Sequence, residues 1–384
     1  MNISRIHRPY RWLALASRIR PAFLLRSIVF SGWCVMQAQA QAQAQAQGPA
    51  PVAAPATATA PIRLRIVGGL ANVNQFVLHE EPFWTRELAR RSGGRYGADI
   101  VPFDRAGVPG SDILTLMQLG VVPFGTALLG QVVASYPELG PPDLAGLSPD
   151  VATLRQVVAA YRPQLIQSLR ERHGLELLAV YIYPAQVFFC TDRISSLKDL
   201  AGRTIRVSSP TQADFVTALD ATPISTSFAE IMPVMRAGQA SCAITGAMSG
   251  RVIGLHDFAK TIYAMPVSWG LALFAANGDA WQALPEELRK LLRDELPRLE
   301  SAIWDESERE SGRQPTCGAG PDCRPGASTR PMTVWPTEAE QRKRREVFER
   351  QILPRWLERC GAGCARLWNR TIATTVGIKA PVAP

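Results

Sequence analysis

Arg206 is the residue in this 384-residue chain whose type and position point most directly to ligand chemistry. It stands in the second half of a β-branched run, Thr204–Val207, and Ser208 and a second serine follow it. In open α/β sheets, ligands bind outside the carboxyl ends of the strands. A guanidinium group is a planar fork of donors that matches a carboxylate. We therefore predict that Arg206 and Ser208 bind an organic acid; the alternative is an exposed arginine at a strand end.

Two further positions could belong to the same site. Trp269 stands between Ser268 and Gly270 in a strand-end context and could form a wall of a ligand cleft, although burial in the core would explain it equally well. Gln75 follows a strand and a glycine pair, and its amide could donate to a ligand from another part of the chain. A place on the surface of a loop is the alternative for Gln75.

Sequence motifs of common enzyme classes are missing. The chain has no G-x-S-x-G, no H-E-x-x-H, no phosphate-binding P-loop and no G-x-G-x-x-G. Its four histidines stand singly, the first of them in the N-terminal leader. We therefore predict no enzymatic activity, no cofactor and no metal. An exported enzyme that acts on a carboxylate metabolite is one alternative, and a ligand-sensing module is another.

The cysteines predict disulfides. Cys34 lies in the N-terminal leader, and the six that remain are an even number, which fits an oxidising compartment. Two pairs are close enough in sequence to close local loops. The cysteines of a third pair lie on two predicted strands and could face each other; two buried free thiols are the alternative for that pair. A zinc site built from the last four cysteines is a rival with the wrong spacing. The pairs are Cys317–Cys323, Cys360–Cys364 and, for the strands, Cys190–Cys242.

The stretch 195–246 predicts the elements that must position Arg206. Two helical segments separate three strands, and the second helix opens with the capping box Ser227–Glu230. This alternation implies right-handed crossovers and a largely parallel sheet. The predicted strands are Thr204–Val207, Ala221–Thr226 and Ala240–Thr245.

The same stretch resembles a known family. The runs LKDLAGRTIRV, residues 197–207, and ATPISTSFAEIMPVMRAGQ, residues 221–239, are similar to the solute-binding proteins of tripartite ATP-independent periplasmic (TRAP) transporters, dicarboxylate-binding type. A looser match extends over residues 62–304. The resemblance implies a two-lobed periplasmic binding protein fold of the α/β class, type II-like, whose lobes are joined by crossing strands and a long helix. It also implies a monomer that captures an organic acid between the lobes and delivers it to TRAP membrane subunits.

The resemblance also implies roles for two residues. The arginine of the R-V run holds the ligand carboxylate in that family, and Arg206 occupies its position. Thr245 lies where the family usually has an asparagine that contacts the ligand, so we include Thr245 among the ligand-binding residues. The chain departs from the family pattern at Ser241-Cys242, in place of Asp-Gly, and at Pro233, inside a predicted helix. These departures leave the identity of the ligand open.

The N-terminal residues predict export to the periplasm. Residues 1–41 carry six arginines, no acid and a short apolar segment, followed by Ala-Gln repeats that offer A-x-A cleavage points within Gln37–Gln47. This pattern is typical of a signal peptide, and an uncleaved anchor is the alternative. Residues 42–61 are an Ala-, Gln- and Pro-rich linker. Without the leader the net charge falls from +9 to +3, so nothing indicates a nucleic-acid partner.

The mature chain has about 340 residues, more than one hydrophobic core normally serves, which favours two α/β lobes. We expect residues 62–185 to form mainly the first lobe, 186–275 mainly the second, and 276–384 to be C-terminal helices, with Cys-rich segments, that span the lobes. Further expected elements include the strands 62–67, 98–103, 120–129, 175–183, 186–191 and 267–275. The expected helices include 76–92, 111–119, 151–173, 281–310 with a kink or break at Pro297, and a last one opened by Thr337–Glu340 whose basic run, 342–345, forms a solvated face.

Overall fold

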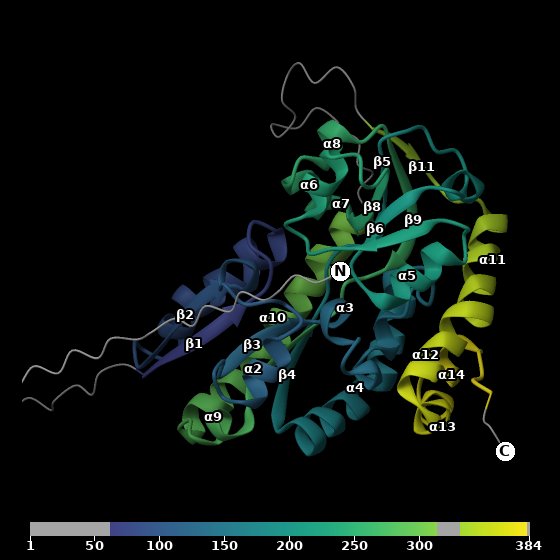
Figure 1. Ribbon diagram of the computed structural model, residues 1–384. Coiled ribbons are helices and arrows are strands. Elements are labelled where there is room, and N and C mark those ends of the chain that lie inside the picture. Colours follow the sequence, from purple (N-terminus) through teal and green to yellow (C-terminus); the bar gives the residue numbers. More distant parts are fainter. Residues whose placement is uncertain (1–61, 313–330, 382–384) are drawn as a thin grey trace, which may run out of the picture. The chain divides into compact units, whose positions relative to one another are not determined.

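The computed structural model describes residues 62–312 and 331–381, and all of these belong to one compact unit (Figure 1). The predicted signal peptide (1–41), the linker (42–61) and the pair Cys317–Cys323 lie outside the described residues. Two β-sheets form the two lobes of the predicted fold.

The first lobe is built on a five-stranded sheet in the order β2-β1-β3-β10-β4. In β1, Leu64 and Ile66 are buried while Arg63 and Arg65 are exposed, the alternation of a strand with one covered face. β1 pairs in parallel with β2 and β3, whereas β10 is antiparallel to β3 and β4. The strands are β1 (Ile62–Gly68), β2 (Tyr96–Pro102), β3 (Phe124–Leu128), β4 (Leu175–Tyr181) and β10 (Ala272–Asn277).

The second lobe is built on a six-stranded sheet in the order β11-β9-β5-β8-β6-β7. β6 is parallel to β7 and β8, as the strand-helix-strand pattern predicts. β5, however, is antiparallel to both β8 and β9, so the largely parallel arrangement holds only for part of the sheet. The strands are β5 (Gln186–Cys190), β6 (Thr204–Val207), β7 (Thr222–Ser225), β8 (Cys242–Gly246), β9 (Thr261–Ser268) and β11 (Met332–Val334).

Two segments cross between the lobes. The first connects β4 to β5, and the second connects β9 to β10 through Trp269–Leu271. The strand expected over 267–275 is therefore two strands in different sheets, because Gly270 turns the chain with a positive φ of 62°. The Asp143 carboxylate holds this turn, accepting hydrogen bonds from the backbone N–H groups of Trp269 (2.8 Å) and Leu271 (3.0 Å).

Two long helices pack against β4 of the first lobe, and the second of them also reaches the second lobe. α4 (Val151–His173) begins at Asp150, whose side chain accepts from the backbone N–H of Thr153. α10 (Glu286–Gly312) packs against β4, against the first helical segment of the chain and against α7. It continues as one helix through Pro297, so the helix is not broken there.

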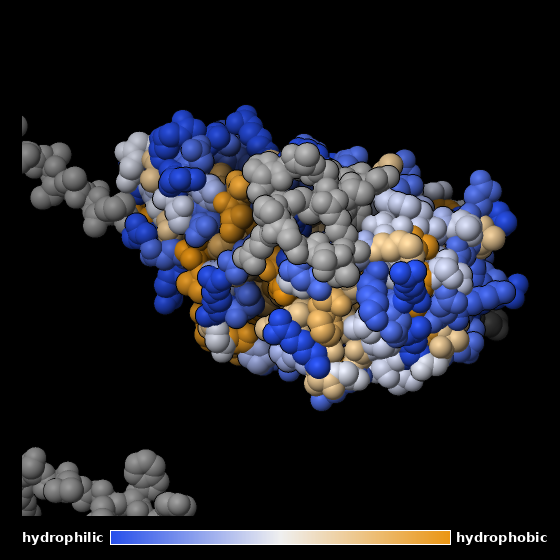
Figure 2. All heavy atoms as spheres, turned by 90° about the horizontal axis from the view of Figure 1, so that it is seen from above, coloured by the Kyte–Doolittle hydropathy of each residue, from blue (hydrophilic) through white to orange (hydrophobic). Residues whose placement is uncertain are grey.

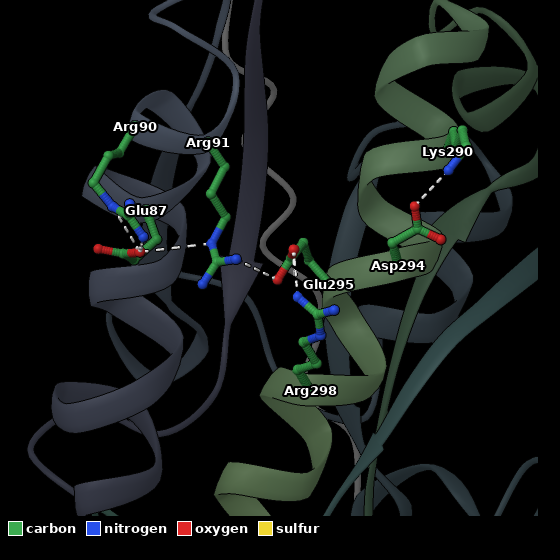
Figure 3. A network of polar contacts seen from close by, with 7 residues as sticks. All are labelled: Glu87, Arg90, Arg91, Lys290, Asp294, Glu295 and Arg298. Carbon is green, nitrogen blue, oxygen red and sulfur yellow. Dashed lines mark hydrogen bonds and ion pairs between the residues drawn. The ribbon is translucent and has the colours of Figure 1, made fainter.

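The first helical segment covers the helix expected over 76–92 and is tied to α10 by ion pairs. It consists of two wide π-helical stretches, η1 (Gln75–Glu80) and η2 (Phe83–Glu87), and then α1 (Leu88–Arg91). Figure 3 shows Arg91 between two carboxylates, 3.6 Å from that of Glu87 and 2.8 Å from that of Glu295 on α10. This network fastens the outer face of the first lobe to the helix that also reaches the second.

The remaining helices are short, and those at the C-terminus gather beside α4 and α5 (Figure 1). Thr337 and Glu340 form a capping box at the start of α11, where the sequence predicted a helix to open. The basic run 342–345 was expected to form a solvated face, but this is wrong for Arg344 in α11. Arg344 is 5% exposed and donates to the carbonyl of Gly146. The α-helices are α2 (Ile113–Gln118), α3 (Leu129–Val132), α5 (Pro210–Thr217), α6 (Ile231–Arg236), α7 (Ala247–Val252), α8 (Leu255–Phe258), α9 (Gly278–Gln282), α11 (Glu338–Val347), α12 (Leu353–Cys360), α13 (Ala362–Arg370) and α14 (Ile372–Val376).

The surface of the described part is polar on the face that Figure 2 shows, where hydrophobic side chains gather only in narrower areas between hydrophilic ones. Within residues 62–312 and 331–381, every helix is too short or too polar to span a bilayer.

Candidate ligand-binding site

A cavity of about 60 Å³ lies where strand ends of both sheets approach each other. A single buried water needs roughly 10–15 Å³, so the cavity has room for a small molecule. The first lobe contributes residues after β1 and at the end of β3, and the second contributes residues of β6 and β8. The lining residues are Leu70, Leu128, Gly130, Gln131, Tyr183, Gln186, Arg206, Ser208, Phe228, Thr245, Ser249, Gly270 and Leu271.

Arg206 is fixed on the second-lobe side of this cavity. Its side chain is 2% exposed. Nε donates to Oγ1 of Thr226 (3.2 Å), Nη2 to the carbonyl of Thr226 (2.5 Å) and Nη1 to the carbonyl of Ile244 (3.0 Å). A guanidinium has five N–H groups, so one on Nη1 and one on Nη2 have no acceptor among the described residues. Two adjacent donors of this kind are what a carboxylate accepts.

The charge of Arg206 is also only weakly compensated inside the described structure. Burial lowers its pKa to about 10, and the exposed carboxylate of Glu230 opposes this only in part. The side chain is therefore still cationic at neutral pH. None of the ion pairs between described residues includes Arg206, and a buried charge without a partner is costly. An anion in the cavity would offset that cost.

Ser208 and Thr245 line the cavity together with Arg206. The Ser208 hydroxyl donates to Oε1 of Gln212 (3.1 Å), and Gln212 in turn donates to the hydroxyl of Ser268 (2.9 Å). Thr245 lies on β8 and is 3% exposed, and its hydroxyl has no hydrogen-bond partner among the described residues. It is free to bond with a ligand.

The structure places Trp269 and Gln75 away from this cavity. Trp269 is buried in the core, which was the alternative to a place in the cleft wall. Its indole N–H donates to the carbonyl of Ser148 (3.0 Å). Gln75 is also buried, and its amide donates to Ser307 (3.1 Å) and Glu310 (2.8 Å) on α10. Both side chains hold the frame around the site.

Several lining residues were not identified as candidate site residues from the sequence. Tyr183 lies on the first crossing segment and Gln186 is the first residue of β5, directly after it; this region was predicted as a crossing but not as a wall of the cleft. The hydroxyl oxygen of Tyr183 accepts from the backbone N–H of Leu70 (3.0 Å), and Nε2 of Gln186 donates to the carbonyl of Pro184 (2.8 Å). Polar side chains on a segment that joins two lobes are the signal that could have identified them.

A buried carboxyl group lies behind the first-lobe wall. Glu80 is 2% exposed, and it accepts from the backbone N–H of Gly69 (2.7 Å) and from the hydroxyl of Thr126 (3.1 Å). Burial raises its pKa to about 7. A Cβ at Gly69 would lie 2.6 Å from the Tyr183 hydroxyl and 2.9 Å from Oε2 of Glu80. Only glycine therefore lets the chain pass between this carboxyl and the cavity.

Two disulfides lie in the described residues. Cys190 and Cys242 stand opposite each other on β5 and β8, both fully buried. Cys360 and Cys364 join the end of α12 to α13. Cys242 of the first bridge lies on β8, the direct neighbour of β6, which carries Arg206.

Comparisons with known proteins place this architecture among solute-binding proteins. The family profile described as "Bacterial extracellular solute-binding protein, family 7" matches residues 71–313. An extracytoplasmic solute receptor of Bordetella pertussis, crystallised as one that binds pyroglutamic acid, superposes with a TM-score of 0.69 at 18% identity, over 80% of this chain and 98% of the receptor. A TRAP periplasmic solute-binding protein of Desulfovibrio salexigens with bound orotic acid gives 0.69 at 16% identity, over 82% and 99%. A third, from Pseudomonas aeruginosa with bound L-malate, gives 0.66 at 16% identity, over 78% and 100%. No curated protein sequence matches the chain.

Proposed function

This chain belongs to the bacterial extracellular solute-binding proteins of family 7, whose profile matches more than half of its length, and from that premise we propose that it captures a small organic acid in the cavity around Arg206. The chain then acts as the extracytoplasmic receptor of a TRAP transporter. It holds the acid between its lobes and delivers it to the membrane subunits. The predicted signal peptide and the name of the family agree with action in the periplasm.

The observation that carries this proposal is the state of Arg206. The side chain is buried and cationic, and two of its N–H groups are unused among the described residues. A carboxylate would accept both and neutralise the charge. Hydrogen bonds to charged groups are stronger than neutral ones, so this contact would both anchor and orient the ligand.

The wall around the cavity supports capture by closure of the two lobes. Phe228 from the second lobe packs against the hydrophobic cores of both lobes. Arg206 and Thr245 belong to one lobe and Leu70 and Leu128 to the other, so a ligand in the cavity would contact both. Ligand contacts of this kind favour the closed arrangement over the open one.

The solved structures with similar folds include receptors crystallised with pyroglutamic acid, orotic acid and L-malate, each of which has a carboxylate. We propose the same ligand class for this chain, and we propose binding without turnover.

A thermal-shift screen of organic acids on the purified mature protein tests the proposal. We expect at least one carboxylate to raise the melting temperature, and the same acid to give a saturable calorimetric titration. A screen in which no carboxylate stabilises the protein would contradict organic-acid capture. Nuclear magnetic resonance spectra of the bound acid over hours test the second part, because consumption of the acid would indicate an exported enzyme.

A further inference from the structure

We propose that the ligand is a monocarboxylate whose other end is neutral and both donates and accepts a hydrogen bond, as an amide or a hydroxyl does, rather than a dicarboxylate. This inference rests on the proposed function and narrows it. It follows from the charges and hydrogen-bonding groups that line the cavity.

The cavity has one charged side chain. Arg206 is the only charged residue among the lining residues in the described part of the chain, and the other polar ones are glutamines, hydroxyls and a tyrosine. One guanidinium pairs with one carboxylate. A second carboxylate in this cavity would lose hydrating water without a cation to compensate it, which is unfavourable.

The crossing segment and the start of β5 offer a neutral donor and a neutral acceptor. The oxygen of the Tyr183 hydroxyl already accepts from Leu70, and its own proton has no acceptor among the described residues, so it can donate to a ligand. Gln186 is oriented by Pro184, whose carbonyl can only accept; Nε2 therefore faces Pro184. Oε1 of Gln186 is left as an acceptor, with no donor among the described residues. An amide or a hydroxyl on the ligand can accept from Tyr183 and donate to Gln186, both of which line the cavity.

The buried carboxyl of Glu80 disfavours a second negative charge on this side. Gly69 bonds to Glu80 through its N–H and also lies against the Tyr183 hydroxyl. When ionised, Glu80 repels an anion near Tyr183, and when protonated it supplies no positive charge. In neither state does the first-lobe wall compensate a second carboxylate.

Most of the remaining lining is apolar, apart from the neutral polar side chains of Gln131 and Ser249, and it limits the size of the ligand. Leu70, Leu128, Phe228 and Leu271 supply its apolar side chains. A short aliphatic or cyclic carbon frame buries well against such side chains. Together these features describe a small acid with its carboxylate at Arg206 and a neutral polar group at Tyr183 and Gln186.

Matched pairs of acids test the inference on the full mature protein. Succinamate and succinate have the same number of heavy atoms and differ in one end, as do glutaramate and glutarate. Both carboxyls of the diacids are ionised at pH 7.5. We expect calorimetry to give the monoamides at least about tenfold higher affinity than the matched diacids.

The variant Tyr183→Phe removes the neutral donor and keeps the ring. We expect it to weaken the bound monoamide by roughly 2- to 10-fold, the worth of one neutral hydrogen bond, and to lower the ratio of monoamide to diacid affinity. Tyr136→Phe is the matched control, since the Tyr136 hydroxyl bonds to exposed Thr115 (3.0 Å) and does not line the cavity. That control should leave the ratio unchanged.

The outcomes distinguish a wrong inference about the ligand's second end from a wrong proposal of organic-acid capture. Diacids that bind as tightly as their monoamides, or more tightly, overturn the inference and leave organic-acid capture standing. Equal ratios in wild type and Tyr183→Phe would also overturn it. If neither the pairs nor any other acid binds, the proposed function itself is wrong.

Discussion

The substitution Glu80→Gln should remove a loss of stability that the wild-type protein suffers as the pH rises. Glu80 is buried next to the cavity, and burial raises its pKa from 4.5 to about 7. Between these two values the unfolded chain has released the proton while the folded protein still holds it. The contribution of this group to stability is therefore complete below pH 4.5 and is lost as the pH rises through 7.

The magnitude follows from the size of the shift. A displacement of about 2.5 pKa units, from 4.5 to about 7, at about 1.36 kcal/mol per unit, corresponds to about 3 kcal/mol between the two protonation states. Most of this, roughly 2–3 kcal/mol, should be lost between about pH 5 and pH 8. A glutamine side chain at this position cannot ionise. From about pH 5 to pH 8, the free energy of unfolding should therefore fall by roughly 2–3 kcal/mol less in Glu80→Gln than in the wild type.

Urea unfolding of ligand-free wild type and Glu80→Gln at several pH values between about 5 and 8 measures this difference. Glu81→Gln is the matched control, since Glu81 is the next residue and is exposed. The control should follow the wild type at every pH. Parallel pH dependences for wild type and Glu80→Gln would refute the reasoning, because they would mean that Glu80 ionises in the folded protein as freely as in the unfolded chain.

Three other predictions follow from the packing, the bridges and the leader. Gly69→Ala would place a Cβ 2.6 Å from the Tyr183 hydroxyl, so ligand affinity should fall at least about tenfold in calorimetry, whereas Gly363→Ala, with open space around it, should bind normally. Replacing both Cys190 and Cys242 with alanine should lower the free energy of unfolding by about 4 kcal/mol, against about 2 kcal/mol for Cys360 and Cys364, because the first bridge closes a longer loop; equal losses in urea unfolding would contradict this. Mass spectrometry of periplasmic protein should find an N-terminus within residues 37–47, and an intact Met1 would contradict the predicted cleavage.

Much of the fold could be predicted from local sequence patterns. β6 has the bounds expected for it, and α4 does as well, because β-branched runs and a capped amphipathic segment are determined by near neighbours in the chain. The split of 267–275 into two strands could not be predicted in this way. It depends on Asp143, more than a hundred residues earlier, which holds the turn at Trp269 and Leu271.

The site could be predicted only where one residue type implied a role. Arg206 stands out because a cation on a strand end is unusual and has a definite use. Tyr183 and Gln186 became visible only through partners that position them, the N–H of Leu70 and the carbonyl of Pro184. Arg344 is the reverse case, since a run of basic residues indicated a solvated surface and the structure buries one of them against Gly146.

Arg206 and Arg344 together provide a controlled test of the central claim, that Arg206 binds the carboxylate of the ligand. Both arginines are buried, both have a pKa lowered to about 10, and only Arg206 lines the cavity. Lysine keeps the charge but loses the paired donors of the guanidinium. The comparison therefore isolates the geometry of one contact.

The decisive measurement is a calorimetric titration of wild type, Arg206→Lys and Arg344→Lys with the acid selected by the thermal-shift screen. Circular dichroism checks that each variant is folded. Hydrogen bonds to a charged group contribute about 1.5–3 kcal/mol, so Arg206→Lys should bind roughly 10- to 100-fold more weakly. Arg344→Lys should lose stability and keep its affinity. Equal affinities of wild type and folded Arg206→Lys would contradict the claim that this arginine holds the ligand.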